Sequence, residues 1–351
     1  MSNNSLVHKL TRGRLFWPLV ALALLVLVNF WFNRNFFNIE YRNGSFFGSI
    51  IDILNRAAPI MLIGMGMTLV IATRGIDISV GAIVAISGAV AATMIGGTLV
   101  IQNGVQTYVS NTPMALAILA AIGAGLVCGL WNGMLVAGAG MQPIIATLIL
   151  MTAGRGIAQL ITGGQIITVY YEPFFFFGNG FLFGIPFSIF IVLAVAAVLL
   201  LLVHKTALGL FIQAVGLNPT AARFSGISAR TLIFWVYGFC GVTAAISGVI
   251  VASNVKSADG NNAGLMMELD AILAVALGGT SLDGGRFSLV GTLLGALILQ
   301  TLSYAIYSLG VPPEINLVVK AIVVFVVCLI QSDALRSMLF SASARRVQEK
   351  S

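Results

Sequence analysis

The sequence predicts an all-α, polytopic helical membrane protein with about ten transmembrane helices and with both termini in the cytoplasm. Three observations support this fold class. Hydrophobic residues make up 59% of the 351 residues and charged residues only 8%, whereas soluble domains carry about 25% charged residues. Apolar stretches close to the length of a membrane span, about 20 residues, recur along the whole chain. Lys and Arg gather in alternate connecting segments, as expected for cytoplasmic loops.

Ten apolar stretches bounded by polar residues, glycine or proline are the expected spans: 15–33, 57–73, 79–101, 113–137, 143–162, 187–203, 231–252, 265–282, 288–309 and 315–333. The first follows basic residues, as the apolar part of a signal peptide would, but it is longer and no cleavage site follows it. We therefore expect a retained span, and one transmembrane domain over 1–351.

The basic residues predict the orientation. With the N-terminus in the cytoplasm, 12 of the 18 Lys and Arg residues fall in cytoplasmic segments and four outside, while Arg155 and Lys320 lie within spans. The net charge of +7 is thus spread between apolar blocks instead of forming a stripe, so nucleic acid is not an expected partner. The external segments are short, so a solute captured outside has to be delivered by another protein.

The longest cytoplasmic segment, 204–230, is expected to carry a short docking helix. It begins and ends with basic residues and contains a partly apolar stretch, 207–215. Its small residues would let an interfacial helix seat closely in a groove of another protein. The alternative is a plain basic loop.

Enzymatic chemistry is not expected, and no residue is assigned a catalytic role. The sequence contains no G-x-x-x-x-G-K-[ST] phosphate-binding loop. Its two histidines, His8 and His204, lie at cytoplasmic edges, and none of the three cysteines has a second cysteine or a histidine nearby. We therefore expect this chain to bind no metal.

A polar motif at 66–81 interrupts the apolar blocks. Asp77 and Ser79 are expected to offer capping oxygens to a helix that starts near Ser79, after a turn that Gly75 permits. This pattern indicates either a capped helical hairpin or a polar pathway, because irregular backbone at membrane depth survives only against protein or water.

A second polar motif covers 261–286, where Glu268 and Asp270 are expected near the outer entrance of a short span. They could meet the hydroxyls of a sugar or the basic residues of a partner, or they could start a solvated helix. Arg155, inside a span, fits either a functional site or a structural pair with carboxylates or carbonyls.

Three ordered motifs resemble the permease subunits of bacterial ribose-type sugar importers of the ATP-binding-cassette class. They are G-M-T-L-V-I-x-x-x-G-I-D-I-S-V-G, A-V-G-x-N-x-x-A-A-x-x-S-G-I and E-L-D-A-I-x-A-V-x-L-G-G-T-S-L-x-G-G, and the match extends over about 51–331. Within this family the nearest resemblance is to galactofuranose permeases. The chain departs from the family's pattern at Arg74, where a small residue is common, and in the aromatic run 174–177.

The resemblance implies a non-catalytic subunit of the bacterial inner membrane that binds no cofactor, since partner subunits use the ATP. Its partners would be membrane lipid, a second permease (identical or paralogous), cytoplasmic ATP-binding subunits, and a soluble periplasmic or lipid-anchored sugar-binding protein. The substrate would be a furanose or another monosaccharide such as galactofuranose or ribose. The family's segment for ATPase coupling is matched here by Gly216, Asn218, Ala221, Ala222, Gly226 and Ile227.

We expect seven polar or charged residues to contribute to the translocation pathway: Thr68, Asp77, Ser79, Asn132, Arg155, Glu268 and Asp270. This passage needs no tight binding site, because a deep energy well would slow release.

Three other functions stay open. They are a branched-chain amino acid permease of the same class, an ion-coupled secondary carrier, and a passive channel or membrane scaffold. The segment 204–230 and the scarcity of carboxylates in mid-span favour an ATP-driven partner over an ion-coupled carrier.

Overall fold

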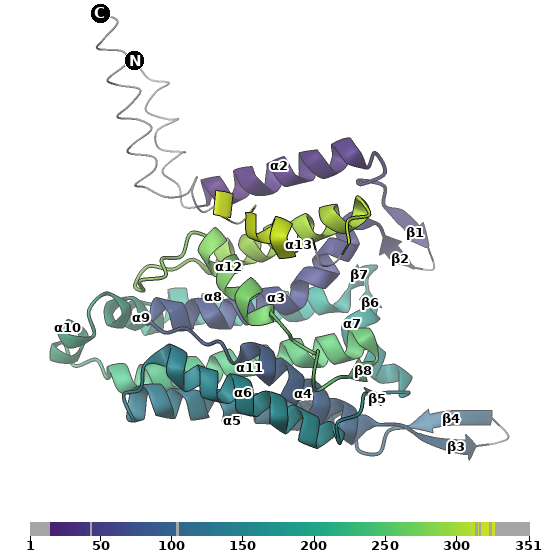
Figure 1. The fold of residues 1–351 in the computed structure, drawn as a ribbon, viewed down its shortest axis with the longest axis horizontal. Helices are drawn as coiled ribbons and strands as arrows, with labels where there is room; N and C mark the ends of the chain where they lie inside the picture. The colour runs from purple at the N-terminus through teal and green to yellow at the C-terminus, as the bar shows by residue number, and fades with distance from the viewer. Residues whose placement is uncertain are drawn as a thin grey trace, which may run out of the picture.

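A computed structural model describes residues 15–42, 44–102, 105–312, 315, 317–322 and 325–326. Most of this part of the chain is helical, and the long helices lie side by side along the longest axis (Figure 1). Among the described residues, six helices are long and apolar enough to cross a membrane: α3 (Ser49–Ala72), α5 (Met114–Gly133) with the π-helical turn η1 (Met134–Gly138), α6 (Pro143–Thr162), α8 (Phe187–Lys205), α11 (Ala229–Val255) and α13 (Leu289–Ser308). The structure therefore confirms a polytopic helical membrane protein.

Three further helices, α2, α4 and α12, are shorter than the spans expected at their positions. α2 (Phe16–Phe32) has 17 residues and α4 (Val80–Ile95) has 16. The expected span 79–101 ends early because Gly96 and Gly97 both adopt positive φ, at 51° and 136°.

The expected eighth span, 265–282, contains a helix too short to be a full span. Its helix, α12 (Met267–Leu277), has 11 residues, about 16 Å in length, or about half of the hydrocarbon core of a membrane. The apolar composition was read correctly, but the residues before and after it form loops.

α11 lies at the centre of the bundle and packs against α3, α4 and α5. Glycines let α5 and α11 approach closely: a Cβ added to Gly241 would lie 2.2 Å from the carbonyl oxygen of Gly125. Small residues commonly make such contacts between membrane helices.

One end of the bundle carries all the strands of the described chain, in four antiparallel pairs: β1 (Glu40–Arg42) with β2 (Ser45–Phe47), β3 (Thr98–Gln102) with β4 (Val105–Val109), β5 (Ile167–Thr168) with β8 (Ser257–Ala258), and β6 (Phe181–Leu182) with β7 (Ile185–Pro186). The short helices η2 (Glu172–Phe175) and α7 (Phe176–Asn179) lie there too. The all-α prediction therefore holds for the bundle but omitted these hairpins.

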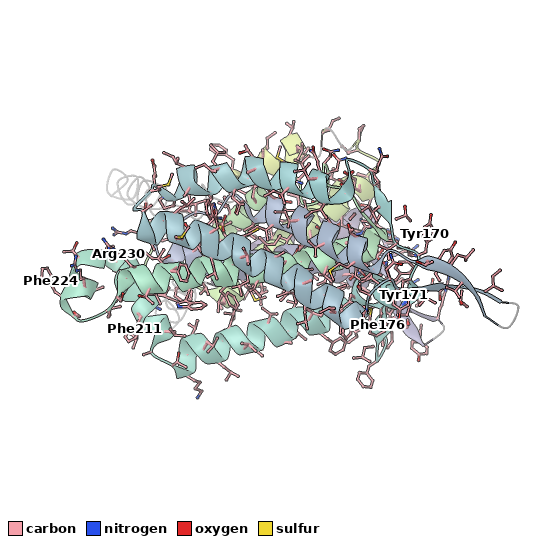
Figure 2. All side chains as sticks on the ribbon, turned by 90° about the horizontal axis from the view of Figure 1, so that it is seen from below. Tyr170, Tyr171, Phe176, Phe211, Phe224 and Arg230 are labelled. Atoms are coloured by element: carbon pink, nitrogen blue, oxygen red, sulfur yellow. The ribbon has the colours of Figure 1, made fainter. Side chains whose placement is uncertain are left out.

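The opposite end carries α9 (Leu208–Leu217) and α10 (Pro219–Phe224), as Figure 2 shows through Phe211, Phe224 and Arg230. Following the predicted orientation, we call this the inner end and the end with the strands the outer end. The orientation itself stays a prediction. The expected tenth span, 315–333, is helical at 315, 317–322 and 325–326, and its remaining residues lie outside the described part of the chain.

Candidate functional site

A non-helical break, 73–79, carries the chain from the end of α3 to the start of α4. Asp77 organises this break: its Oδ1 accepts hydrogen bonds from Ser79 N at 3.0 Å, from Ser79 Oγ at 2.6 Å and from Asn132 Nδ2 at 3.3 Å. Asn132 Nδ2 also donates to Ser79 Oγ at 2.8 Å. All three side chains are fully buried. We call these three residues the Asp77 cluster.

The capping prediction was half right. Asp77 accepts from the backbone ahead of α4, as expected, but the Ser79 side chain makes no capping bond and donates its hydroxyl to Asp77 instead. The serine therefore satisfies the carboxylate and leaves the helix end to the aspartate.

Asn132 Oδ1 has no hydrogen-bond partner among the described residues, while the thiol of Cys240 lies against the Asp77 carboxylate and the Tyr237 hydroxyl lies against the backbone of Ile76. Tyr237, on α11, is fully buried, and its hydroxyl lies against Gly75, where an added Cβ would be 2.5 Å from it. Buried unpaired polar atoms are uncommon and costly. Sequence patterns contain no signal for Tyr237, because it lies within an apolar helix.

The start of the short helix α12 lies beside the start of the short helix α4. Glu268, in its first turn, is 3% exposed. A Cβ added to Gly81 of α4 would lie 2.2 Å from Glu268 Oε2 and 2.4 Å from Gly264 O. Glu268 is thus packed against α4 instead of standing at a solvated entrance, and its Oε2 has no partner in the described chain.

The loop 259–266, which precedes α12, is held by side chains of α6. Arg155 Nη1 donates to Ala263 O and, at 3.3 Å, to Asn261 O. Gln159 Nε2 donates to Asn261 Oδ1. Arg155 therefore binds carbonyls, which is the structural alternative for an intramembrane arginine. We call 259–266 the re-entrant loop.

Within this loop, Asn262 Nδ2 donates to Asp259 Oδ2 at 2.7 Å. This hydrogen bond, with backbone N–H groups and Arg155 adding to it, lowers the pKa of Asp259. The loop is thereby ordered by its own polar groups, although Asp259 is only partly covered and Asn261 and Asn262 are exposed.

Two expected pathway residues lie outside both groups. Asp270 forms an ion pair with Lys320, whose Nζ lies 3.0 Å from Oδ2 and 3.1 Å from Oδ1. The hydroxyls of Thr68 and Thr292 lie 2.6 Å apart, and Thr68 also donates to Gly64 O. The structure thus joins Asp77, Ser79 and Asn132 but not Thr68.

At the inner end, the predicted docking helix is two helices, α9 and α10. Asn218 joins them: its Oδ1 accepts from Thr220 N and Ala221 N, both at 3.0 Å, and so caps α10. Gly216 and Ala222 are buried, whereas Ala221 and Gly226 are exposed. Gly226 has a φ of 81° and open space around it.

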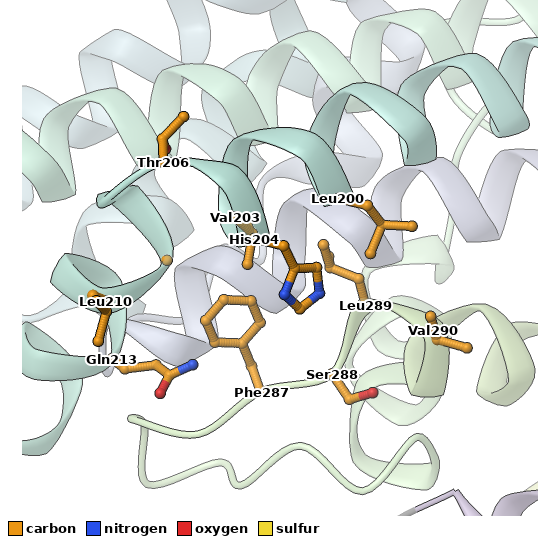
Figure 3. A pocket seen from close by; sticks show the side chains of 11 residues that line it. Leu200, Val203, His204, Thr206, Leu210, Gln213, Phe287, Ser288, Leu289 and Val290 are labelled. Carbon is orange, nitrogen blue, oxygen red and sulfur yellow. The ribbon is translucent and has the colours of Figure 1, made fainter.

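A cavity of about 320 Å³ also opens at the inner end, between α8, α9 and the start of α13 (Figure 3). His204, Gln213 and Ser288 bring polar groups to it, among apolar side chains such as Leu200 and Phe287. None of the expected pathway residues lines this cavity. In the described residues, no three His, Cys, Asp or Glu side chains gather as around a metal ion.

Comparison with known proteins identifies a family and several relatives. The family described as "Branched-chain amino acid transport system / permease component" matches residues 49–328. The galactofuranose transporter permease protein YtfT of Escherichia coli (strain K12) is 46% identical over 98% of this chain and 99% of its own length. The fructose import permease protein FruF of Bifidobacterium longum (strain NCC 2705) is 39% identical over 98% of this chain and 94% of its own. The ribose import permease protein RbsC of Escherichia coli (strain K12) is 36% identical over 90% of this chain and 92% of its own. No solved structure matches the chain.

Proposed function

The chain belongs to the permease family that matches residues 49–328, and from this premise we propose that it is the membrane subunit of an ATP-driven sugar importer of the bacterial inner membrane. Relatives that align over nearly the full chain are permeases for galactofuranose, fructose and ribose, which supports a monosaccharide as the substrate. The 46% identity to the galactofuranose permease makes a furanose the first candidate.

One structural observation carries the translocation role: the re-entrant loop exposes Asn261 and Asn262 beside Arg155, close to the middle of α6. Arg155 is the 13th of the 20 residues of α6. Irregular backbone at membrane depth persists only where protein covers it or where it lines water. A second permease that faces this loop across a narrow aqueous passage meets that requirement, and the exposed amides match the hydroxyls of a sugar.

The remaining expected residues have a different place in this proposal. Thr68 and the Asp77 cluster are fully buried within the chain, so a sugar reaches them only while the bundle opens. Glu268 and Asp270 lie directly after the re-entrant loop, so its movement changes their surroundings first. Together with Arg155, these six residues are proposed as a transient pathway, without a tight binding site.

The proposed partner proteins bind at the inner and the outer end of the bundle. At the inner end, α10 presents Phe224, which is 89% exposed, and the basic residue Arg223, while Arg230 is exposed at the start of α11. Exposed aromatic side chains are common at protein interfaces, and the resemblance to ribose-type permeases implies ATPase coupling by the residues that we propose for it here: Gly216, Asn218, Ala221, Ala222, Gly226 and Ile227. A sugar-binding protein would dock on the hairpins of the outer end.

The test is uptake by the chain reconstituted in vesicles with a candidate ATP-binding subunit, a second permease and a sugar-binding protein. ATP-dependent uptake of labelled galactofuranose, or of ribose or fructose, is expected. Uptake of leucine in preference to sugars would support the branched-chain amino acid alternative that the family description raises. Uptake driven by an ion gradient without ATP would identify a secondary carrier. The chain alone should hydrolyse no ATP.

A further inference from the structure

Three backbone segments meet at the inner end with no side chain between them: the end of α3, the end of α9 and the loop that follows α12. Gly285 N donates to Ala72 O at 2.9 Å. A Cβ added to Gly216 would lie 1.9 Å from Ala72 O and 2.5 Å from Gly285 N. We call this contact the inner junction.

Arg74 fastens the inner junction. Its Nη2 donates to Leu217 O at 2.8 Å and its Nε donates to Asp283 O at 3.2 Å. Its stem covers Gly284, where an added Cβ would lie 2.5 Å from Arg74 Cγ. One side chain on the first segment therefore binds both of the others.

The acceptors suit a guanidinium group. Leu217 is the last residue of α9, and the carbonyls at the end of a helix carry the negative end of its dipole. The two donors are separate nitrogens of one rigid, planar group, so they hold two carbonyls in a fixed relation.

The backbone of Arg74 also indicates a constrained position. Its φ is 64°, in the left-handed region that non-glycine residues seldom adopt. The side chain is exposed, so burial does not explain the arginine; its two hydrogen bonds do.

Each segment of the junction leads to a different functional part. From Arg74 the chain runs through the break to the Asp77 cluster and α4. Asp283 lies in the loop that connects α12 to α13, and Leu217 connects α9 to α10. Close-packed segments transmit displacement because they are barely compressible. A movement of α9 therefore acts on the attachments of both short helices.

We propose that Arg74 is a positioning residue that couples α9 and α10 to the two short helices, α4 and α12. This inference rests on the proposed function. A movement that an ATP-binding partner imposes on α9 and α10 then shifts both short helices together, and with them the Asp77 cluster and the re-entrant loop.

The test compares Arg74→Ala, Arg74→Gly and Arg74→Lys with the wild type, in the reconstituted complex. Arg56→Ala is the matched control, because Arg56 is exposed near the other end of α3. For Ala and Gly we expect the number of sugar molecules imported per ATP hydrolysed to fall about fivefold, since water replaces the lost bonds of an exposed side chain only in part. In Arg74→Lys, which keeps the positive charge but has only one donor group, the number of sugar molecules imported per ATP hydrolysed should fall about twofold.

Arg74→Gly separates coupling from folding, because glycine adopts the positive φ without strain and should fold at least as well as the wild type. A second measurement needs no partner: amide exchange of Gly285 in the isolated chain should be faster in the Ala and Gly variants and unchanged in Arg56→Ala.

Two results overturn the inference while leaving the function intact: an unchanged import ratio in Arg74→Ala, or equal losses of import and hydrolysis that keep the ratio constant. Unchanged exchange at Gly285 contradicts the fastening role of Arg74. If the wild-type complex imports no sugar, the proposed function fails, and the coupling inference fails with it.

Discussion

The two short helices begin in opposite ways. Before α4, the side chains of Asp77, Ser79 and Asn132 hydrogen-bond to one another, and all three are buried inside the chain. Before α12, main-chain carbonyls of the re-entrant loop are held by Arg155 of another helix, and neighbouring loop side chains face outward.

This difference indicates that the start of α4 has a structural role and that the start of α12 forms an exposed surface. A polar break sealed by its own chain needs nothing further at its surface, whereas an exposed break within a membrane requires another protein or water beside it. The start of α4 therefore supports the bundle, and in the proposed function the start of α12 is the part that lines the passage. Substitutions in each region test this division.

The largest effect is expected where the starts of α4 and α12 touch. Gly81→Ala places a carbon 2.2 Å from Glu268 Oε2 and 2.4 Å from Gly264 O, so α4 and the re-entrant loop must separate. We expect a loss of about 2–3 kcal/mol in the free energy of unfolding, measured by thermal unfolding in detergent. Gly156→Ala is the control, because its added Cβ meets nothing within 4 Å. Equal stabilities would disprove the close contact.

The next effect concerns the sealed start of α4. Asp77→Ala removes the acceptor of three hydrogen bonds and should cost about 2 kcal/mol of stability, whereas Asp77→Asn keeps a capping oxygen. If Asp77 serves structure alone, the Asn variant should transport nearly normally.

Uptake assays at matched protein levels decide between charge and capping. Impaired uptake by a well-folded Asn variant would show that the charge itself acts in translocation. An Ala variant with wild-type stability and uptake would remove both roles.

The exposed start of α12 should show the reverse pattern, with large effects on transport and small ones on stability. Arg155→Ala frees the re-entrant loop; because the side chain is half-buried, we expect about 1 kcal/mol of destabilisation. Faster amide exchange over 259–266 and reduced uptake should accompany it. Thr152→Ala, one turn earlier on α6, is the control, since its hydroxyl bonds only its own helix. Loss of folding in Arg155→Ala would assign the loop to support instead.

The smallest effect is a pH dependence of the re-entrant loop. Because folding lowers the pKa of Asp259, its ionised form adds stability above the ordinary carboxyl pKa, and this stability is lost as the pH falls through the lowered value. Protection of the amides of 260–263 against exchange, relative to their intrinsic rates at each pH, should therefore fall below about pH 4. In Asp259→Asn this pH response should be absent; its persistence would point to another group.

Sequence patterns predicted the helices best where both ends carry local signals. α6 has the predicted bounds, because Pro143 occupies its first turn and Gly163 follows its last residue with a φ of 63°. α12 has an equally apolar sequence, but its length depends on the loop before it, which Arg155 holds from 106 residues away. Hydropathy contains no information about such a contact.

The same limit applies to the site. Asp77 and Ser79 stand out by sequence, yet their bonds to Asn132, 55 and 53 residues away, require the fold. Thr292 and Tyr237 were missed because each lies among apolar residues on a spanning helix. Arg74 stood out only as a departure from a family pattern, and its two acceptors come from distant segments.

The glycine contact between α5 and α11 has a consequence for mutational tolerance. At Gly125 and Gly129 the facing helix leaves no room even for a methyl group. Even the smallest substitution there, to alanine, is therefore expected to be destabilising. Val127, between them in sequence, is 67% exposed and can exchange among Ile, Leu and Val at little cost. An exhaustive substitution scan would therefore record a narrow line of intolerance with a period of four residues, beside positions that drift freely. We therefore expect most tolerated substitutions on α5 to lie on its outward face.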